Sequence, residues 1–169
     1  MTMPAQRPYQ SKQDYATPKA FLDVAKTLLN IKTFNIDFAA DETNAVHTDY
    51  FDEQTDALSV SAKDWAEYCQ DGFGWLNPPY ENIAPWAERC RDVKGLGGNV
   101  LLLIPASVGS NWFKSYVHNQ AWVLFLNGRL AFIPDHPTWL YPKDCILCVY
   151  GPDIATRYDV WNWRKGEIS

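Results

Sequence analysis

The chain alternates between segments in which apolar residues recur every three or four positions and shorter runs in which they are nearly continuous. The first pattern predicts amphipathic helices over residues 17–29, 61–69 and 111–118, and a further helix that begins at Asn82. Each start carries a side chain whose oxygen can accept the unpaired N–H groups of a first helical turn. Pro18 suits the first helical position, which needs no N–H donor. The expected caps are Thr17, Ser61, Asn82 and Ser110.

The continuous apolar runs predict strands over residues 34–38, 73–76, 99–104 and 121–126. Residues 100–104 are apolar at every position, which is typical of a central strand in a parallel sheet with both faces covered. After the turn signal Asn127-Gly128, residues 129–133 and 145–150 are expected to form an antiparallel pair. Strands that alternate with helices predict an α/β fold with a doubly wound, mostly parallel sheet and an antiparallel C-terminal pair.

The composition fits one packed domain. The 169 residues are 47% hydrophobic and 15% aromatic, which is enough for a single core that needs neither metal nor disulfide. Residues 1–13 are polar and without periodicity, so we expect a flexible leader there and one domain over residues 14–169. No apolar run approaches the roughly 18 residues of a membrane span. The first residues also lack the order of a signal peptide, so a cytoplasmic location is expected.

The charge balance limits the kinds of partner. The chain has 15 Lys and Arg against 20 Asp and Glu, a formal net charge of −5. A protein that holds nucleic acid through phosphate contacts alone should be basic, so a tight non-specific binder is not expected. An enzyme that touches DNA briefly through one local basic face is compatible with this charge.

Cysteines and histidines do not predict a metal site. Cys145 and Cys148 have the spacing of a zinc knuckle, but residues three apart on a strand point to opposite faces. His47, His118 and His136 are scattered along the chain. We therefore expect buried thiols and no bound metal.

The sharpest chemical signal is the run Asn77-Pro78-Pro79-Tyr80, which directly follows a predicted strand. Ligands of doubly wound sheets bind at such strand ends. The exocyclic amine of adenine or cytosine is a poor nucleophile, because its lone pair is delocalised into the ring. The Asn77 side-chain oxygen and the Pro78 carbonyl could accept its protons, while Pro79 stiffens the turn and the Tyr80 ring offers a stacking face for a flipped base.

Several runs in fixed order resemble the phage-type DNA N6-adenine methyltransferases. The likeness spans residues 14 to 150, and the spaced series is far more specific than any single run. The runs are Asp14-Tyr15-Ala16-Thr17-Pro18, Asp37-Phe38-Ala39-Ala40-Asp41 with Asn44, Asp56-Ala57-Leu58, Asn77-Pro78-Pro79-Tyr80, Leu103-Ile104-Pro105-Ala106 and Gly128-Arg129-Leu130-Ala131-Phe132.

The resemblance implies a Rossmann-like methyltransferase fold, S-adenosylmethionine as donor, adenine in DNA as acceptor and a phage or prophage gene expressed in a bacterial host. It makes Asn77, Pro78, Pro79 and Tyr80 catalytic, with the target adenine flipped out of the duplex and methylated by in-line displacement. The donor-binding residues that it implies are Tyr15, Thr17, Pro18, Asp37, Ala39, Ala40, Asp41, Asn44, Asp56 and Asn77.

Within this donor set, Asp37 is expected near the methionine ammonium group, and Asp41 or Asp56 near the ribose hydroxyls or the adenine amine. The chain departs from methyltransferases at large in one respect, since their donor loop is usually rich in glycine. No glycine occurs before Gly72, so Ala39 and Ala40 must let the backbone approach the donor without easy access to positive φ.

Candidate DNA contacts are the basic residues Lys114, Arg129 and Lys143, together with the aromatic residues Trp112, Trp139 and Tyr141. At this length we expect no separate target-recognition domain. Target specificity should therefore come from the loops at 42–57, 106–112 and 134–143.

Two alternatives remain open. The turn at residues 77–80 could bind another planar nitrogen, such as cytosine N4, an RNA base or a glutamine side-chain amide. The chain could instead be a donor-binding module without catalysis, which the acidic charge and the missing glycines favour and the intact run at 77–80 opposes.

Overall fold

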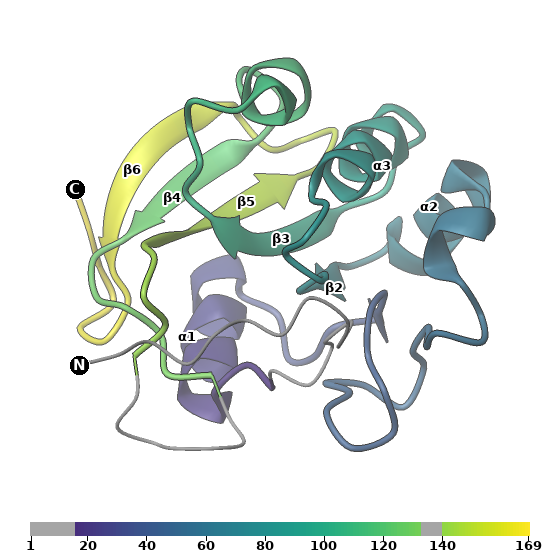
Figure 1. Cartoon of the computed structure of the whole chain (residues 1–169), viewed down its shortest axis with the longest axis horizontal. Coiled ribbons are helices and arrows are strands. Elements are labelled where there is room, and N and C mark those ends of the chain that lie inside the picture. Colours follow the sequence, from purple (N-terminus) through teal and green to yellow (C-terminus); the bar gives the residue numbers. More distant parts are fainter. Residues whose placement is uncertain (1–15, 133–139) are drawn as a thin grey trace.

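The computed structural model describes residues 16–132 and 140–169 (Figure 1). The predicted leader at 1–13, the donor-binding candidate Tyr15 and the DNA-contact candidate Trp139 lie outside the described residues. Within the described part, seven strands form one sheet in the order β1-β2-β3-β5-β4-β6-β7. The strands are β1 (Ile36–Asp37), β2 (Gly74–Leu76), β3 (Val100–Pro105), β4 (Trp122–Leu126), β5 (Cys145–Tyr150), β6 (Arg157–Asn162) and β7 (Glu167–Ile168).

The sheet is mixed. Strands β1, β2 and β3 run parallel, β5 is antiparallel to both β3 and β4, β6 is parallel to β4, and β7 is antiparallel to β6. Five strands (β1, β2, β3, β4 and β6) therefore point the same way, and their carboxyl ends share one edge of the sheet. The expected α/β sheet, with parallel N-terminal strands and an antiparallel C-terminal part, is confirmed at this level.

The predicted pairing of residues 129–133 with residues 145–150 is wrong. Residues 129–132 form no strand. Strand β5 inserts between β3 and β4 and pairs with both, so neither of its edges is open to a further strand. The segment after Gly128 is instead held by one backbone hydrogen bond, from Tyr141 N to Leu130 O at 2.7 Å.

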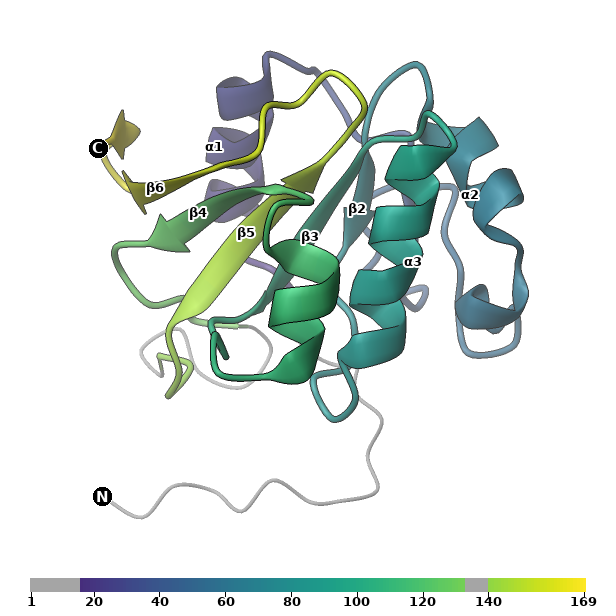
Figure 2. The ribbon, with the colours of Figure 1, turned by 90° about the horizontal axis from the view of Figure 1, so that it is seen from above.

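Helices cover both faces of the sheet. Helix α1 (Lys19–Leu29) lies on one face, while α3 (Ala84–Gly95) and the helical segment 111–117, which contains η2 (Phe113–Val117), cross the other (Figure 2). Helix α2 (Ala62–Cys69) packs beside α3. Alternate residues of β3 enter the two cores: Leu101 and Leu103 join the core under α1, whereas Leu102 and Ile104 join the core under α3. This two-faced burial explains the continuous apolar run of β3.

Two predicted caps are confirmed. Ser61 accepts a hydrogen bond from Asp64 N at 3.1 Å, and Ser110 accepts one from Phe113 N at 3.4 Å. The caps Thr17 and Asn82 are wrong.

Pro18 occupies the cap position of α1 and Ile83 that of α3, neither with a side-chain bond. Asn82 fails as a cap because the third residue after it is Pro85, which has no N–H to donate. Thr17 fails because its hydroxyl is held elsewhere, by the side chain of Asn77.

The cysteines are free and buried, as expected. Cys145 lies in the core under α1 and Cys148 in the core under α3, so the zinc-knuckle spacing does not bring them together. Among residues 16–132 and 140–169, no group of three or more His, Cys, Asp or Glu side chains is arranged to hold a metal ion. No helix in this described part is long and apolar enough to cross a membrane.

Candidate active site

The residues that follow β1 and β2 meet at the carboxyl edge of the sheet and line a small pocket there. Its cavity volume is about 10 Å³, roughly the space of one water molecule. Pockets that hold a whole small molecule usually measure about 300–1,000 Å³, so the described side chains do not by themselves enclose a site of that size. The pocket brings together five of the predicted donor residues, which are Thr17, Asp37, Ala39, Asn44 and Asn77, and adds Val46 and Trp75.

Asp37, the last residue of β1, supplies a buried carboxylate to this pocket. Its side chain is 3% exposed. One carboxylate oxygen accepts a hydrogen bond from Ala39 N and the other from Val46 N, both at 3.1 Å. Burial nevertheless dominates and raises the pKa of Asp37 to about 7. A carboxyl group with this pKa is readily ionised by a cationic ligand group placed beside it.

The loop after β1 passes the pocket without glycine. Ala39 and Ala40 are buried, and neither has a positive φ. Small side chains, rather than left-handed backbone, therefore let this loop pack closely. The loop does not need the conformation that glycine-rich donor loops adopt.

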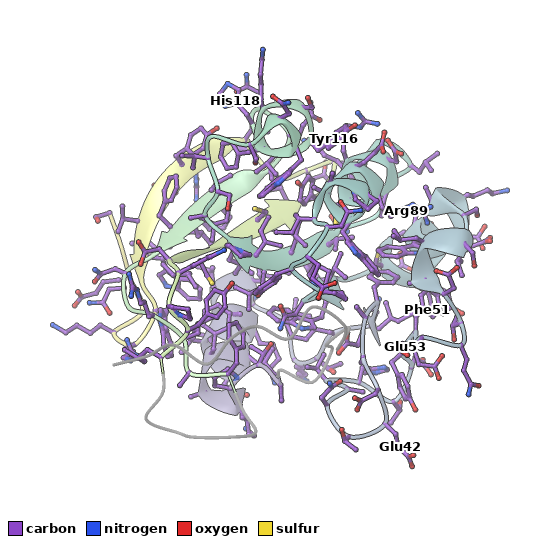
Figure 3. All side chains as sticks on the ribbon, viewed as in Figure 1. Glu42, Phe51, Glu53, Arg89, Tyr116 and His118 are labelled. Atoms are coloured by element: carbon purple, nitrogen blue, oxygen red, sulfur yellow. The ribbon has the colours of Figure 1, made fainter. Side chains whose placement is uncertain are left out.

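Asp41 shapes this loop instead of lining the pocket. Its carboxylate accepts hydrogen bonds from Thr43 N at 2.7 Å and Asn44 N at 3.1 Å. In return, Asn44 Oδ1 accepts a bond from Asp41 N at 2.9 Å, which holds Asn44 at the pocket. Glu42, at the outer part of the loop, points away from the sheet (Figure 3). Asp41 thus acts on the pocket through Asn44.

The structure does not bring Asp56 to the pocket. Asp56 is exposed, has a φ of 48° and ends a turn that Asp52 and Thr55 stabilise. The following residues are fixed from another direction, because Arg89 reaches from α3 to the carbonyl groups of Leu58 and Val60 (Figure 3). This contact anchors the loop but leaves the Asp56 side chain outside the pocket lining.

The side-chain amide of Asn77 is held at both ends. Asn77 Nδ2 donates a hydrogen bond to Thr17 Oγ1 at 3.2 Å. The Tyr80 hydroxyl donates a hydrogen bond to Asn77 Oδ1 at 2.7 Å. Pro78, the next residue in the sequence, is buried, and Pro79 is partly exposed.

Tyr80 belongs to an aromatic cluster at the same edge. Its ring meets Phe132 edge-on with centroids 6.2 Å apart, and Tyr141 edge-on at 5.7 Å. Phe132 and Tyr141 also contact each other, at 5.5 Å. Burial raises the pKa of the Tyr80 hydroxyl well above its ordinary value, so this group stays protonated as a donor. The sequence predicts Tyr141 only as a candidate DNA contact, and its contact with the Tyr80 ring was not predicted.

The basic candidates differ in their positions. Arg129 is exposed and pairs with Asp144 at 3.0 Å, and Lys143 is exposed just before β5. Lys114 is exposed on the helical segment that crosses the face of the sheet. Sequence reasoning missed Arg164, whose Nη2 donates to Arg129 O at 3.0 Å. The available signal was the run Trp163-Arg164-Lys165.

Comparison with known proteins defines the class of protein. The model of the family "DNA N-6-adenine-methyltransferase (Dam)" matches residues 5–139, which is most of the chain. The chain therefore belongs to this family and is a DNA N6-adenine methyltransferase. Membership implies S-adenosylmethionine as methyl donor and DNA as substrate.

A curated relative agrees with this assignment. The chain is 30% identical over 125 residues to the DNA N-6-adenine-methyltransferase of Haemophilus phage HP1 (strain HP1c1). The match covers 72% of this chain and 67% of the phage protein.

Proposed function

We propose that this chain methylates adenine N6 in DNA by direct in-line displacement on a base flipped out of the duplex. The observation that carries the proposal is the position of Asn77, which lines the pocket of the predicted donor residues and also receives the Tyr80 hydrogen bond. A single side chain thus joins the donor pocket to the surface offered to the base. The parallel strands and two covered faces are consistent with a Rossmann-like methyltransferase fold.

The proposed role of the catalytic turn is to accept protons of the adenine amine. The Asn77 Oδ1 atom, with the Pro78 carbonyl, draws the amine hydrogens away from the ring plane and makes the nitrogen lone pair available. That lone pair would attack the methyl carbon, the electrons of the sulfur–carbon bond would go to sulfur to give S-adenosylhomocysteine, and the methylated amine would pass one proton to solvent water. The turn acts by positioning and by hydrogen bonding, without a covalent intermediate on the enzyme.

The donor pocket fits a ligand that carries a positive charge. The methionine part of S-adenosylmethionine has an ammonium group, and the buried Asp37 carboxylate is the matching partner. Thr17 and Asn44 supply further polar atoms, while Asp41 acts through Asn44. S-adenosylmethionine supplies an electrophilic methyl group. We propose that Tyr15 and Pro18 complete the donor site from the segment before α1. Asp56 lies outside the pocket lining, and we propose that it contacts the part of the donor that extends beyond the pocket.

The base and its DNA context are assigned to residues around the aromatic cluster. Tyr80 offers stacking surface for the flipped adenine, which recovers part of the unstacking cost of a few kcal/mol. We propose that residues 14–169 act as one domain, with target specificity supplied by the loops at 42–57, 106–112 and 134–143. Arg129, Lys143 and Lys114 are the proposed phosphate contacts, and we propose that Trp139 also contacts the DNA.

Nucleoside mass spectrometry tests the proposal. Purified protein is incubated with S-adenosylmethionine and unmethylated plasmid DNA, and the DNA is then digested to nucleosides. We expect N6-methyladenine with the wild type and none above background with Asn77→Ala. N4-methylcytosine in the digest, or methyl transfer to RNA or protein instead of DNA, would overturn the proposed acceptor. Binding of the donor with no transfer to any of these substrates would identify a non-catalytic module.

A further inference from the structure

Four basic residues gather at the carboxyl edge of the sheet, outside the donor pocket. Strands β4 and β6 end at the same edge as β2, so Arg129 follows β4 and Arg164 and Lys165 follow β6 at that edge. Lys143 precedes β5, which starts there because β5 runs in the opposite direction. All four side chains are exposed. This local excess of positive charge contrasts with the net negative charge of the whole chain.

Arg164 is fixed by contacts that make it more than a solvated surface charge. Its guanidinium lies over the Trp163 ring at 4.3 Å, and Nη2 donates to Arg129 O at 3.0 Å. Trp163 is buried, donates from Nε1 to Gly128 O at 2.9 Å and meets the Phe21 ring of α1 edge-on at 5.4 Å. The turn after β6 is thereby anchored to the turn after β4.

Gly128 provides the space for this arrangement. Its φ is 113°, and a Cβ atom built there would lie 2.3 Å from Arg164 Nη1. A larger residue would be strained in its backbone and would also displace the guanidinium. The bond to Arg129 O uses one of the five N–H donors of Arg164, so the guanidinium retains further donors for an anion.

The basic residues flank the aromatic cluster beside Asn77. Arg129 precedes Phe132 by three residues, and Lys143 follows Tyr141 by two. Phe132 and Tyr141 both contact the Tyr80 ring. Because these cations are two or three residues from side chains that contact Tyr80, we expect them to lie near the phosphates of a DNA strand whose base reaches Tyr80.

We propose that the turn between β6 and β7, through Arg164 with Lys165, forms a phosphate-binding surface with Arg129 for the DNA strand that carries the target adenine. The inference rests on the proposed function and extends it, because this turn lies beyond residues 5–139, the part matched by the family. A guanidinium held by a tryptophan face and a backbone carbonyl is pre-organised for bidentate binding of a phosphate.

The same strand contains a matched control. Arg157, at the start of β6, stacks on Trp122 at 4.2 Å and pairs with Asp159 at 3.0 Å. It is thus an exposed arginine on a tryptophan face, like Arg164, but it lies at the opposite edge of the sheet. Arg157→Gln and Arg164→Gln change the net charge equally, so the two variants differ in position and in the partner that is lost, which is Asp159 for Arg157 and Arg129 O for Arg164.

The test measures binding of a short fluorescein-labelled DNA duplex by anisotropy, with S-adenosylhomocysteine present, between about 50 and 200 mM salt. We expect Arg164→Gln to weaken binding about fivefold to tenfold at about 0.1 M salt, because one phosphate contact contributes about 0.9 to the slope of log K against log salt. The magnitude of this slope should fall by about 0.9 in this variant, which corresponds to the loss of one phosphate contact. Arg157→Gln should match the wild type, and Arg164→Lys should retain most of the slope. Circular dichroism establishes that each variant is folded.

An unchanged affinity and slope in Arg164→Gln would overturn the inference, as would an equal effect of Arg157→Gln, which would indicate general charge. Equal losses in Arg164→Lys and Arg164→Gln with unchanged slopes would assign Arg164 a purely structural role. The methylation assay is run in parallel on the wild type. N6-methyladenine formation with a normal slope in Arg164→Gln rejects this surface alone, whereas a wild type that neither binds nor methylates DNA rejects the proposed function as well.

Discussion

The hydroxyl of Tyr80 donates a 2.7 Å hydrogen bond to Oδ1 of Asn77, the atom proposed to accept a proton of the substrate amine. The sequence predicts only a stacking role for the Tyr80 ring. The structure adds a second connection, because the hydroxyl fixes the direction of the Asn77 amide before a base arrives. Since burial raises the pKa of this hydroxyl well above its ordinary value, it remains a protonated donor at neutral pH.

Removing this hydroxyl should therefore lower the rate of methyl transfer. We expect Tyr80→Phe to reduce kcat about threefold to tenfold, which corresponds to the loss of one hydrogen bond of about 0.5–1.5 kcal/mol. Tyr80→Ala should lose more, because the stacking surface disappears as well. Single-turnover rates on unmethylated duplex DNA measure both effects. A Tyr80→Phe rate equal to that of the wild type would show that the ring alone matters.

Thr17 holds the other end of the same amide, and its substitution separates the hydroxyl from the side-chain volume. Thr17→Val keeps the shape but removes the acceptor for Asn77 Nδ2, so we expect a slower methyl transfer step. Thr17→Ser keeps the hydroxyl and should restore most of the rate. The comparison uses kcat together with donor affinity from calorimetry. Equal rates in the Val and Ser variants would contradict a role for this hydrogen bond.

The sequence predicts those features that repeat along the chain or lie within one local segment. The helical spacing of α1, the two-faced apolar run of β3 and the position of Asn77 after β2 are all of this kind. The Ser61 cap is local as well. These predictions succeed because burial and capping depend on neighbours a few residues away.

Contacts between distant segments could not be predicted in this way. Thr17 and Asn77 are 60 residues apart in the sequence. A threonine directly before a helix is expected from the sequence to cap that helix, so its bond to Asn77 was not predicted. The pairing partners of β5 depend on which edges β3 and β4 leave open. The β6 strand has mainly exposed residues, so its sequence lacks a strong apolar pattern. The proposed roles of Tyr15 and Trp139 stay predictions.

The Asn77 amide itself can be tested by two substitutions. We expect Asn77→Ala to lower methyl transfer by about 10² or more, the order lost when a transition-state hydrogen bond is removed. Asn77→Asp should be milder, because an acceptor oxygen remains and the Thr17 hydroxyl can turn to donate to the carboxylate. Rates are measured at saturating donor and DNA. Retention of more than about half the wild-type rate in Asn77→Ala would remove the basis for assigning this turn to catalysis.

The buried carboxyl of Asp37 should make donor binding depend on pH. Its pKa in the free protein is raised to about 7, so the group is mostly protonated below that pH and mostly ionised above it. Only the ionised form attracts the ammonium group of the donor. Donor affinity in the wild type should therefore be highest above about pH 7 and should fall by up to about tenfold for each pH unit below it, with proton release on binding. Asp37→Asn, which cannot ionise, should bind weakly with little pH dependence.

Calorimetry with S-adenosylhomocysteine, which retains the same ammonium group, provides the measurement from about pH 6 to pH 8, the range in which the free carboxyl titrates. Buffers of different ionisation enthalpy report the protons released. Because both backbone donors to Asp37 lie in the loop that follows β1, circular dichroism is recorded at each pH to establish that the loop and fold persist. A wild-type affinity that is constant over this range, or an Asp37→Asn variant that shows the same pH dependence as the wild type, would mean that another group holds the donor ammonium.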